Sequence, residues 1–171
     1  MTDRKMPNRT FYAESSPTVI DKIWFQWKKS SSSDYPWAEN FVCGFPLPDF
    51  QRGLVWDQEV NTSFIESIWL GFDIGSYMLS DYGTDGNDGL LKYSDCVIDG
   101  QQRLNAIEKY WSDDFPVMGW RWSEITDVDK RVFRSIGFGH KLIRTLDEQF
   151  LRDTYNRLNF SGVNHSLSDM A

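Results

Sequence analysis

Apolar side chains recur along this chain at spacings that predict helices separated by short strands. The apolar residues at 19, 20, 23, 24 and 27 follow the three-to-four-residue spacing of a helix that opens at Ser16-Pro17. The same spacing predicts further helices from Asp57 to Gly71, over about 102–111, from Thr126 through Ile136 and over 147–158. Short apolar runs predict strands over 41–47, 74–79, 91–98 and 140–146, the first of them interrupted by Gly44.

The stretch from Asp81 to Gly89 joins two of these strands and is rich in Asp and Gly. Carboxylates in such a loop can hold calcium. However, the stretch lacks the ligand spacing of an EF-hand loop and its closing glutamate. We therefore interpret it as a polar hairpin connection.

The order of these elements indicates the fold class. Helices and strands alternate without a regular strand–helix–strand repeat, which predicts an α+β fold with a small mixed sheet flanked by helices. A chain of 171 residues has the size of one ordinary domain. We expect residues 1–16 to form a flexible N-terminal arm and residues 17–171 to form a single domain.

The composition is typical of a globular protein without a membrane span. Hydrophobic residues make up 40% of the chain, and no apolar run approaches the roughly 20 residues that a membrane helix needs. The polar start lacks the apolar stretch of a signal peptide, so we expect a cytoplasmic protein. Cys43 and Cys96 each lie in an apolar run and are interpreted as reduced core residues. The scattered His and Cys residues do not have the spacing of a zinc site, and we treat His140 and His165 as ordinary residues.

The net charge of −7 is distributed unevenly. Residues 34–99 carry twelve acidic and two basic side chains, which gives this segment a net charge of −10. This argues against a broad basic surface for DNA. A local nucleic-acid contact would have to use Lys130, Arg131, Arg134, Lys141 and Arg144. The acidic segment suits a metal–nucleotide site, an interface with a basic partner or simply a solvated face.

The most informative stretch runs from Cys96 to Ile107, where a short apolar run ends in Asp99-Gly100 and a helical pattern begins at once. A strand, a tight turn and a helix in this order expose the backbone N–H groups of the first helical turn, which favour an anion. Arg103 adds a guanidinium group that suits phosphate oxygens. Asp99 could hold a metal ion or position a water, or it could merely cap the helix.

Three blocks of sequence carry a resemblance to a known family. They are Leu47-Pro48-Asp49-Phe50-Gln51-Arg52-Gly53-Leu54-Val55-Trp56, Asp99-Gly100-Gln101-Gln102-Arg103-Leu104 and Leu158-Asn159-Phe160-Ser161-Gly162. In wording and order they resemble the ParB/sulfiredoxin-like superfamily, in particular the DGQQR-containing N-terminal domain of GmrSD-type restriction endonucleases. Leu54 departs from that pattern, because an aromatic residue is common at its position. The resemblance implies a ParB-like fold.

The resemblance also implies a nucleotide site in which Asp99 and Arg103 are catalytic. Asp99 would position Mg²⁺ or the attacking water, Gly100 would let the backbone approach a phosphate, and Arg103 would neutralise its charge. Gln101 and Gln102 would supply amides at the helix start. The nucleotide would further contact Gln51, Arg52 and Asn159.

Two of these assignments have structural alternatives. Gln51 and Arg52 could be a buried pair that caps the following helix and packs on Trp56. Asn159 could reach the same cleft or could cap a terminal turn with Gly162.

The resemblance implies nucleotide binding, with Mg²⁺-dependent hydrolysis of a nucleoside triphosphate linked to DNA restriction or to sensing of modified DNA. One alternative is a non-catalytic protein that regulates or antagonises a restriction or phage-defence system. Another is a DNA-binding or nuclease module, which the net charge disfavours. The chain contains no His-Asn-His-like cluster, so we expect that a partner protein would supply any nuclease activity. A homodimer is also compatible with a ParB-like domain.

Overall fold

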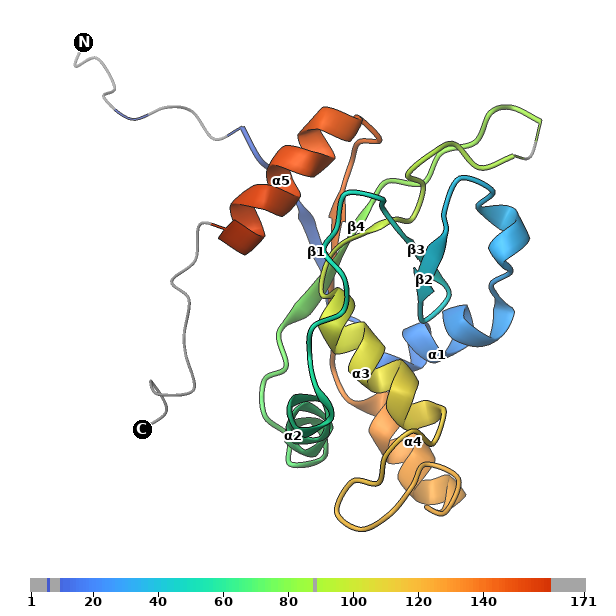
Figure 1. Cartoon of the computed structure of the whole chain (residues 1–171), viewed down its shortest axis with the longest axis vertical. Helices are drawn as coiled ribbons and strands as arrows, with labels where there is room; N and C mark the ends of the chain where they lie inside the picture. The colour runs from blue at the N-terminus through green and yellow to red at the C-terminus, as the bar shows by residue number, and fades with distance from the viewer. Residues whose placement is uncertain (1–5, 7–9, 88, 161–171) are drawn as a thin grey trace.

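A four-stranded sheet organises the chain, as its computed structural model shows (Figure 1). The structure describes residue 6 and residues 10–87 and 89–160. The strands β1 (Glu14–Ser16), β6 (Gly139–Ile143), β4 (Ser76–Ser80) and β5 (Val97–Asp99) lie side by side in that order. The central pair β4–β6 is parallel, whereas β1–β6 and β4–β5 are antiparallel. The sheet is therefore mixed, and the predicted α+β class is confirmed.

Helices cover both faces of the sheet. They are α1 (Ile20–Lys29), the short η1 (Ser32–Asp34), α2 (Gln58–Trp69), α3 (Gln101–Trp111), α4 (Asp127–Ser135) and α5 (Glu148–Phe160). Side chains alternate between the two faces of a strand. In β5, Val97 joins the larger hydrophobic cluster, which includes residues of α1, α2, α3 and α4, and Ile98 joins the smaller cluster, which includes Leu151 and Tyr155 of α5. Thus α5 packs on the face opposite the other four helices (Figure 1).

Local capping signals place the helix boundaries. The Asp57 carboxylate accepts a hydrogen bond from Val60 N at 2.9 Å, so Asp57 is the N-cap of α2 as predicted. Thr126 and Asp129 form a reciprocal capping box at the start of α4. Gly71 follows α2 with φ +79°, a left-handed conformation that ends a helix at little cost for glycine.

The predicted strand over 41–47 is wrong as a single element. It is a hairpin of β2 (Asn40–Val42) and β3 (Phe45–Leu47), whose turn residues Cys43 and Gly44 have φ values of +48° and +76°. Two consecutive positive φ angles are typical of the tight turns that reverse a chain between antiparallel strands. The apolar run concealed this reversal, because a buried hairpin and a buried strand share the same composition.

The predicted strand over 91–98 is wrong in most of its length. Only Val97–Asp99 pairs with β4, and the preceding residues form turns in which Tyr93 and Asp95 have positive φ angles. The Ser80 hydroxyl holds this segment, since it donates to the Tyr93 carbonyl and accepts from Cys96 N at 2.9 Å. The buried Ser80 side chain, more than ten residues away, therefore takes the place of the backbone hydrogen bonds expected of a strand.

Residues 14–16, expected within the flexible arm, instead form the edge strand β1. Arg144 binds the Glu14 carboxylate with two nitrogens, at 3.0 and 2.8 Å. The polar sequence Glu-Ser-Ser carries no apolar strand pattern. Its strand conformation depends on hydrogen bonds to the backbone of β6 and on the Glu14–Arg144 ion pair, neither of which is visible in the local sequence.

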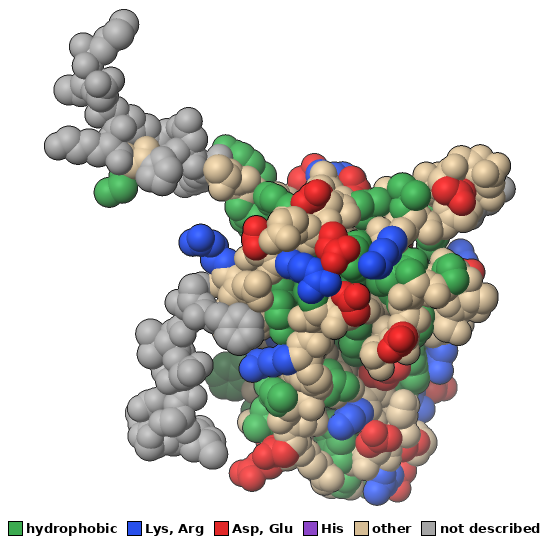
Figure 2. Space-filling view, turned by 45° about the horizontal axis from the view of Figure 1, so that its top comes forward, with side chains coloured by type: hydrophobic (Ala, Val, Ile, Leu, Met, Phe, Trp, Pro, Cys, Tyr) green, Lys and Arg blue, Asp and Glu red, His purple; other side chains and the backbone are tan. Residues whose placement is uncertain are grey.

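Charged side chains of both signs are interspersed over the face shown in Figure 2, without a continuous basic area. Two of the five basic residues considered for a nucleic-acid contact are engaged in ion pairs: Arg134 with Asp21 at 3.5 Å, and Arg144 with Glu14 and Asp81. Cys43 and Cys96 are buried free thiols, as predicted. Within the described ranges, no helix has the length and apolar character needed to cross a bilayer.

Candidate functional site

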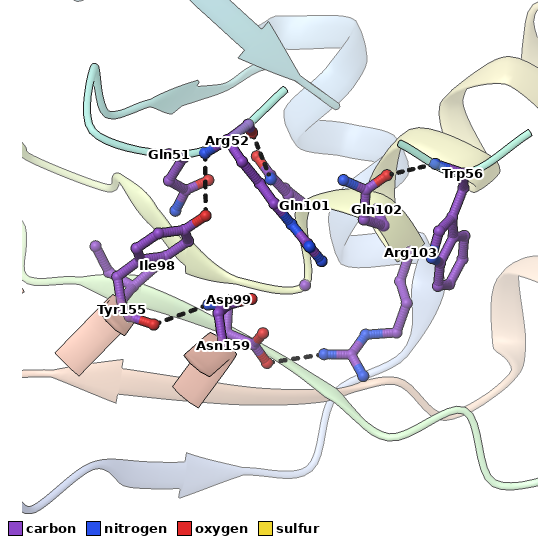
Figure 3. A pocket seen from close by; sticks show the side chains of 11 residues that line it. Gln51, Arg52, Trp56, Ile98, Asp99, Gln101, Gln102, Arg103, Tyr155 and Asn159 are labelled. Carbon is purple, nitrogen blue, oxygen red and sulfur yellow. Dashed lines mark hydrogen bonds and ion pairs between the residues drawn. The ribbon is translucent and has the colours of Figure 1, made fainter. Parts of the chain in front are cut away.

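A cleft of about 180 Å³ opens where β5 ends and α3 begins (Figure 3). Segment 51–56 forms one wall, and the end of α5 forms another. All eight residues selected from the sequence line it: Gln51, Arg52, Asp99, Gly100, Gln101, Gln102, Arg103 and Asn159. The structure thus brings together three segments that lie far apart in the chain, although the roles of these residues remain predictions.

The N-terminus of α3 faces this cleft without a side-chain cap. Gly100 is the N-cap residue, with φ +93°, and among the described residues no side-chain hydrogen bond caps the first turn. A Cβ atom at Gly100 would lie 2.9 Å from Tyr77 Cβ and 3.1 Å from Tyr77 Cα, so only glycine fits. The uncapped N–H groups and the helix dipole together favour an anion at this point.

Asp99 does not cap α3, and that interpretation is therefore wrong. Its Oδ2 instead accepts a hydrogen bond from Arg103 Nη2 at 2.8 Å. The two side chains are 35% and 27% exposed, so the ion pair lies at the cleft surface and solvent reaches it. Arg103 Nε is buried and, among the described residues, has no hydrogen-bond partner.

Arg52 stands opposite this ion pair. Its side chain is exposed, extends into the cleft between Gln101 and Arg103, and has no ion-pair partner in the part of the chain described (Figure 3). The alternative that Gln51 and Arg52 form a buried cap of the following helix is wrong, because Asp57 caps α2 and Arg52 is exposed. Gln51 is half-buried and donates through Nε2 to the Val97 carbonyl at 2.5 Å.

The side chains of Gln101 and Gln102 turn toward the protein's own backbone. Gln101 Nε2 donates to the Arg52 carbonyl at 2.9 Å. Gln102 Oε1 accepts from Val55 N at 3.1 Å and from Trp56 N at 3.2 Å. The resemblance assigns amides at the helix start to these two residues, and in this structure their side-chain amides hold segment 52–56.

The end of α5 completes the cleft with Tyr155 and Asn159. The Tyr155 hydroxyl accepts from Arg52 N at 3.0 Å, and Asn159 Nδ2 donates to the Tyr155 carbonyl at 2.9 Å. Asn159 therefore reaches the cleft, whereas the alternative turn with Gly162 lies outside the described residues. Reasoning from sequence missed Tyr155, whose only signal is its helical spacing of four residues from Asn159.

The donor set fits a magnesium ion only together with a ligand. Asp99 offers one carboxylate, and no group of three or more His, Cys, Asp or Glu side chains suited to a metal occurs in residues 10–87 and 89–160. Mg²⁺ is commonly held by one or two carboxylates, with water and substrate phosphates completing its shell. The cleft therefore suits Mg²⁺ that arrives with a phosphate chain.

His140 lies away from this cleft. It is 9% exposed on β6, where its ring lies 5.1 Å from that of Tyr77. Burial, with a smaller contribution from Lys22, lowers the pKa of His140 to about 4. The imidazole is therefore neutral at pH 7. His165 lies outside the described residues.

Comparisons with known proteins bear on the three sequence blocks. No curated protein and no solved structure matches the chain. A family model described as the N-terminal domain of the GmrSD restriction endonuclease matches residues 38–165. This match spans most of the described fold and the whole cleft. The chain therefore belongs to the family of GmrSD restriction endonuclease N-terminal domains.

Proposed function

We propose that the cleft binds the phosphate chain of a nucleoside triphosphate. The observation that carries this proposal is the meeting of two guanidinium groups, from Arg52 and Arg103, with the uncapped N-terminus of α3. Among the described residues that line the cleft, Asp99 is the only one with an acidic side chain. Two arginines, one carboxylate and the positive end of a helix dipole together favour a polyanion.

The size of the cleft supports phosphates as the part that is enclosed. A drug-sized ligand usually occupies a pocket of about 300–1,000 Å³. The cleft measures about 180 Å³ and therefore suits a phosphate chain better than a whole nucleotide. The base and sugar would extend toward its rim, where Trp56 offers an aromatic ring.

We further propose that the bound triphosphate is hydrolysed, as a step linked to restriction. Phosphoryl transfer depends mainly on positioning and charge neutralisation, which two arginines supply without a protein nucleophile. Asp99 would hold Mg²⁺ or orient the attacking water, and the metal would neutralise phosphate charge. Any cleavage of DNA would fall to a partner protein.

Thermal unfolding with Mg²⁺ and each nucleoside triphosphate tests the binding proposal. A ligand at about 100 times its Kd adds about 2.7 kcal/mol to the free energy of unfolding, or roughly 5–10 °C for a domain of this size. We expect the shift with wild type and with Arg131→Ala, whose side chain is exposed on α4. In Arg103→Ala the shift should fall to about half of the wild-type value or less. Equal shifts in Arg103→Ala and wild type would place the nucleotide elsewhere.

Phosphate release by the same proteins tests hydrolysis separately. Turnover should require Asp99 and Arg103 and should be lost in either alanine variant. Stable nucleotide binding without any phosphate release would contradict hydrolysis. The chain would then be a nucleotide-dependent regulator of a restriction partner.

A further inference from the structure

Gln101 and Gln102 follow the Asp99-Gly100 turn and occupy the first helical positions of α3. We propose that both are positioning residues. They clamp segment 52–56 onto α3, so that the Arg52 guanidinium group faces the helix N-terminus, and their own amides do not bind the phosphates. The inference rests on the proposed function for its ligand, whereas the clamp itself can be tested without one.

The clamp consists of four hydrogen bonds from two buried side chains. Gln101 is 7% exposed and Gln102 is 8% exposed. Besides the bonds to Arg52 O, Val55 N and Trp56 N, Gln102 Nε2 donates to the Gly53 carbonyl at 3.3 Å. The carboxamide of Gln102 thus uses both its acceptor and its donor on one stretch of backbone. Figure 3 marks its bond to Trp56.

Segment 52–56 depends on these bonds for its place. It contains neither helix nor strand, so no regular backbone ladder fixes it. Arg52 is held at both of its backbone groups, because its carbonyl accepts from Gln101 and its N–H donates to the Tyr155 hydroxyl. An exposed arginine has a high rotamer entropy, and a fixed backbone lowers the cost of aiming its charge.

Direct binding of a phosphate by Gln102 would break this arrangement. If its carboxamide turned toward the cleft, the N–H groups of Val55 and Trp56 would lose their acceptor. These bonds are partly buried, and breaking them costs free energy that a new contact would have to offset, so the side chain gains little by exchanging partners. The geometry therefore favours a role for the two glutamines that acts through Arg52.

A double-mutant cycle on affinity for inorganic triphosphate with Mg²⁺ tests this role. Gln101→Met keeps the side-chain length but removes the donor to Arg52 O, and we expect it to weaken binding about fivefold. In an Arg52→Ala background the same change should alter affinity less than about twofold, because the residue it positions is gone. Full additivity of the two changes would overturn the proposal, because it would mean that Gln101 affects binding independently of Arg52.

The control for this cycle is Gln58→Met, the same substitution at an exposed position at the start of α2. It should leave affinity unchanged. A fivefold loss in Gln58→Met would show that the effect of Gln101→Met is not specific to the clamp, and would also count against the proposal.

Hydrogen exchange of the backbone amides of 52–56, without ligand, provides an independent test. Gln102→Glu keeps an acceptor for Val55 N and Trp56 N, whereas Gln102→Met has none. We expect exchange at Val55 and Trp56 to rise about fivefold or more in Gln102→Met and to rise less in Gln102→Glu, which keeps their acceptor but loses the donor to the Gly53 carbonyl. Unchanged exchange in Gln102→Met would overturn the clamp. If wild type bound no triphosphate, the proposed function would fail, and the exchange rates would still decide whether the clamp exists.

Discussion

At the scale of single residues, one carboxylate and two guanidinium groups line a small cleft. Asp99 and Arg103 form an ion pair at 2.8 Å, whereas Arg52 has no ion-pair partner among the residues described. An Asp–Arg pair beside an anion site has two effects, since the carboxylate orients the arginine but also repels the anion. The two partners should therefore differ in what their removal does.

We predict that Asp99→Asn and Arg103→Ala separate binding from turnover. Asp99→Asn keeps the hydrogen-bonding shape and removes the repelling charge, so triphosphate binding should persist while phosphate release is lost. Arg103→Ala removes a charge-assisted contact and should weaken binding by roughly 10- to 150-fold. Calorimetry measures the binding affinity of each variant, and phosphate release measures its turnover. Loss of binding in Asp99→Asn, comparable to that in Arg103→Ala, would contradict these roles.

His140 gives the chain a predictable acid sensitivity. The ordinary His pKa is near 6.5, and burial lowers that of His140 to about 4. Between these values the unfolded chain binds a proton that the folded chain does not, so the free energy of unfolding falls as the pH drops from about 6.5 to 4. The loss should reach up to about 3 kcal/mol.

A comparison with His140→Phe isolates this contribution in urea unfolding at several pH values. The phenyl ring can occupy the same place beside Tyr77. The stability advantage of wild type over the variant should shrink between pH 6.5 and 4. Parallel pH profiles of the two proteins would show that His140 does not titrate as its burial implies.

At the scale of elements, the junction between β5 and α3 depends on a glycine for two separate reasons. Gly100 has φ +93°, and an added Cβ would meet the backbone of Tyr77. We predict that Gly100→Ala lowers the free energy of unfolding by about 2–4 kcal/mol and abolishes triphosphate binding.

The variant Gly71→Ala separates the cost of a positive φ angle from the cost of a steric clash, both of which act at Gly100. Gly71 has φ +79°, but no atom of the described residues lies within 4 Å of the added Cβ. This variant should therefore lose only about 1 kcal/mol, the usual cost of a left-handed alanine. Urea midpoints measure both variants, and equal losses would mean that the contact with Tyr77 is relieved cheaply.

The starts of α2 and α4 could be predicted from the sequence because their signals are local, whereas α1 begins at Ile20 and not at Ser16-Pro17. Asp57 and the Thr126–Asp129 pair cap helices through bonds that span three residues. The strand prediction over 91–98 was wrong because its outcome depends on Ser80, more than ten residues away, which holds the turns at Tyr93 and Cys96. An apolar composition indicates that a segment is buried, but it does not indicate which distant group forms hydrogen bonds with the backbone of that segment.

The candidate site shows the same limit. The residues of the cleft could be named from the three sequence blocks, because each block resembles a motif of the family. The orientation of the Gln101 and Gln102 side chains could not be predicted, because it depends on where Arg52 and Trp56 lie in space. Tyr155 was missed for the same reason, since its hydroxyl meets Arg52 only after α5 packs on the sheet.

At the scale of the whole molecule, the cleft unites structure from both faces of the sheet. Segment 51–56 and α3 contribute residues to it from one side, and α5 contributes Tyr155 and Asn159 from the other. The larger hydrophobic cluster contains or contacts Trp24, Trp27, Trp111 and Trp122, whereas α5 belongs to the smaller cluster. Because both clusters share the strands between them, we expect the domain to unfold as one cooperative unit.

The variant Leu151→Ala tests this cooperativity. Leu151 lies in α5 and is fully buried in the smaller cluster, so its truncation should cost about 2–5 kcal/mol and lower the Tm by roughly 5–15 °C. Tryptophan fluorescence, which reports mainly on the larger cluster, and far-UV circular dichroism should shift together. Leu158→Ala, the same change on the same helix at a side chain that is 45% exposed, should shift the Tm by no more than about 2 °C. If Leu151→Ala lost helical signal early while the fluorescence midpoint stayed in place, α5 would be a separate unit. A ligand in the cleft would then stabilise the two faces unequally.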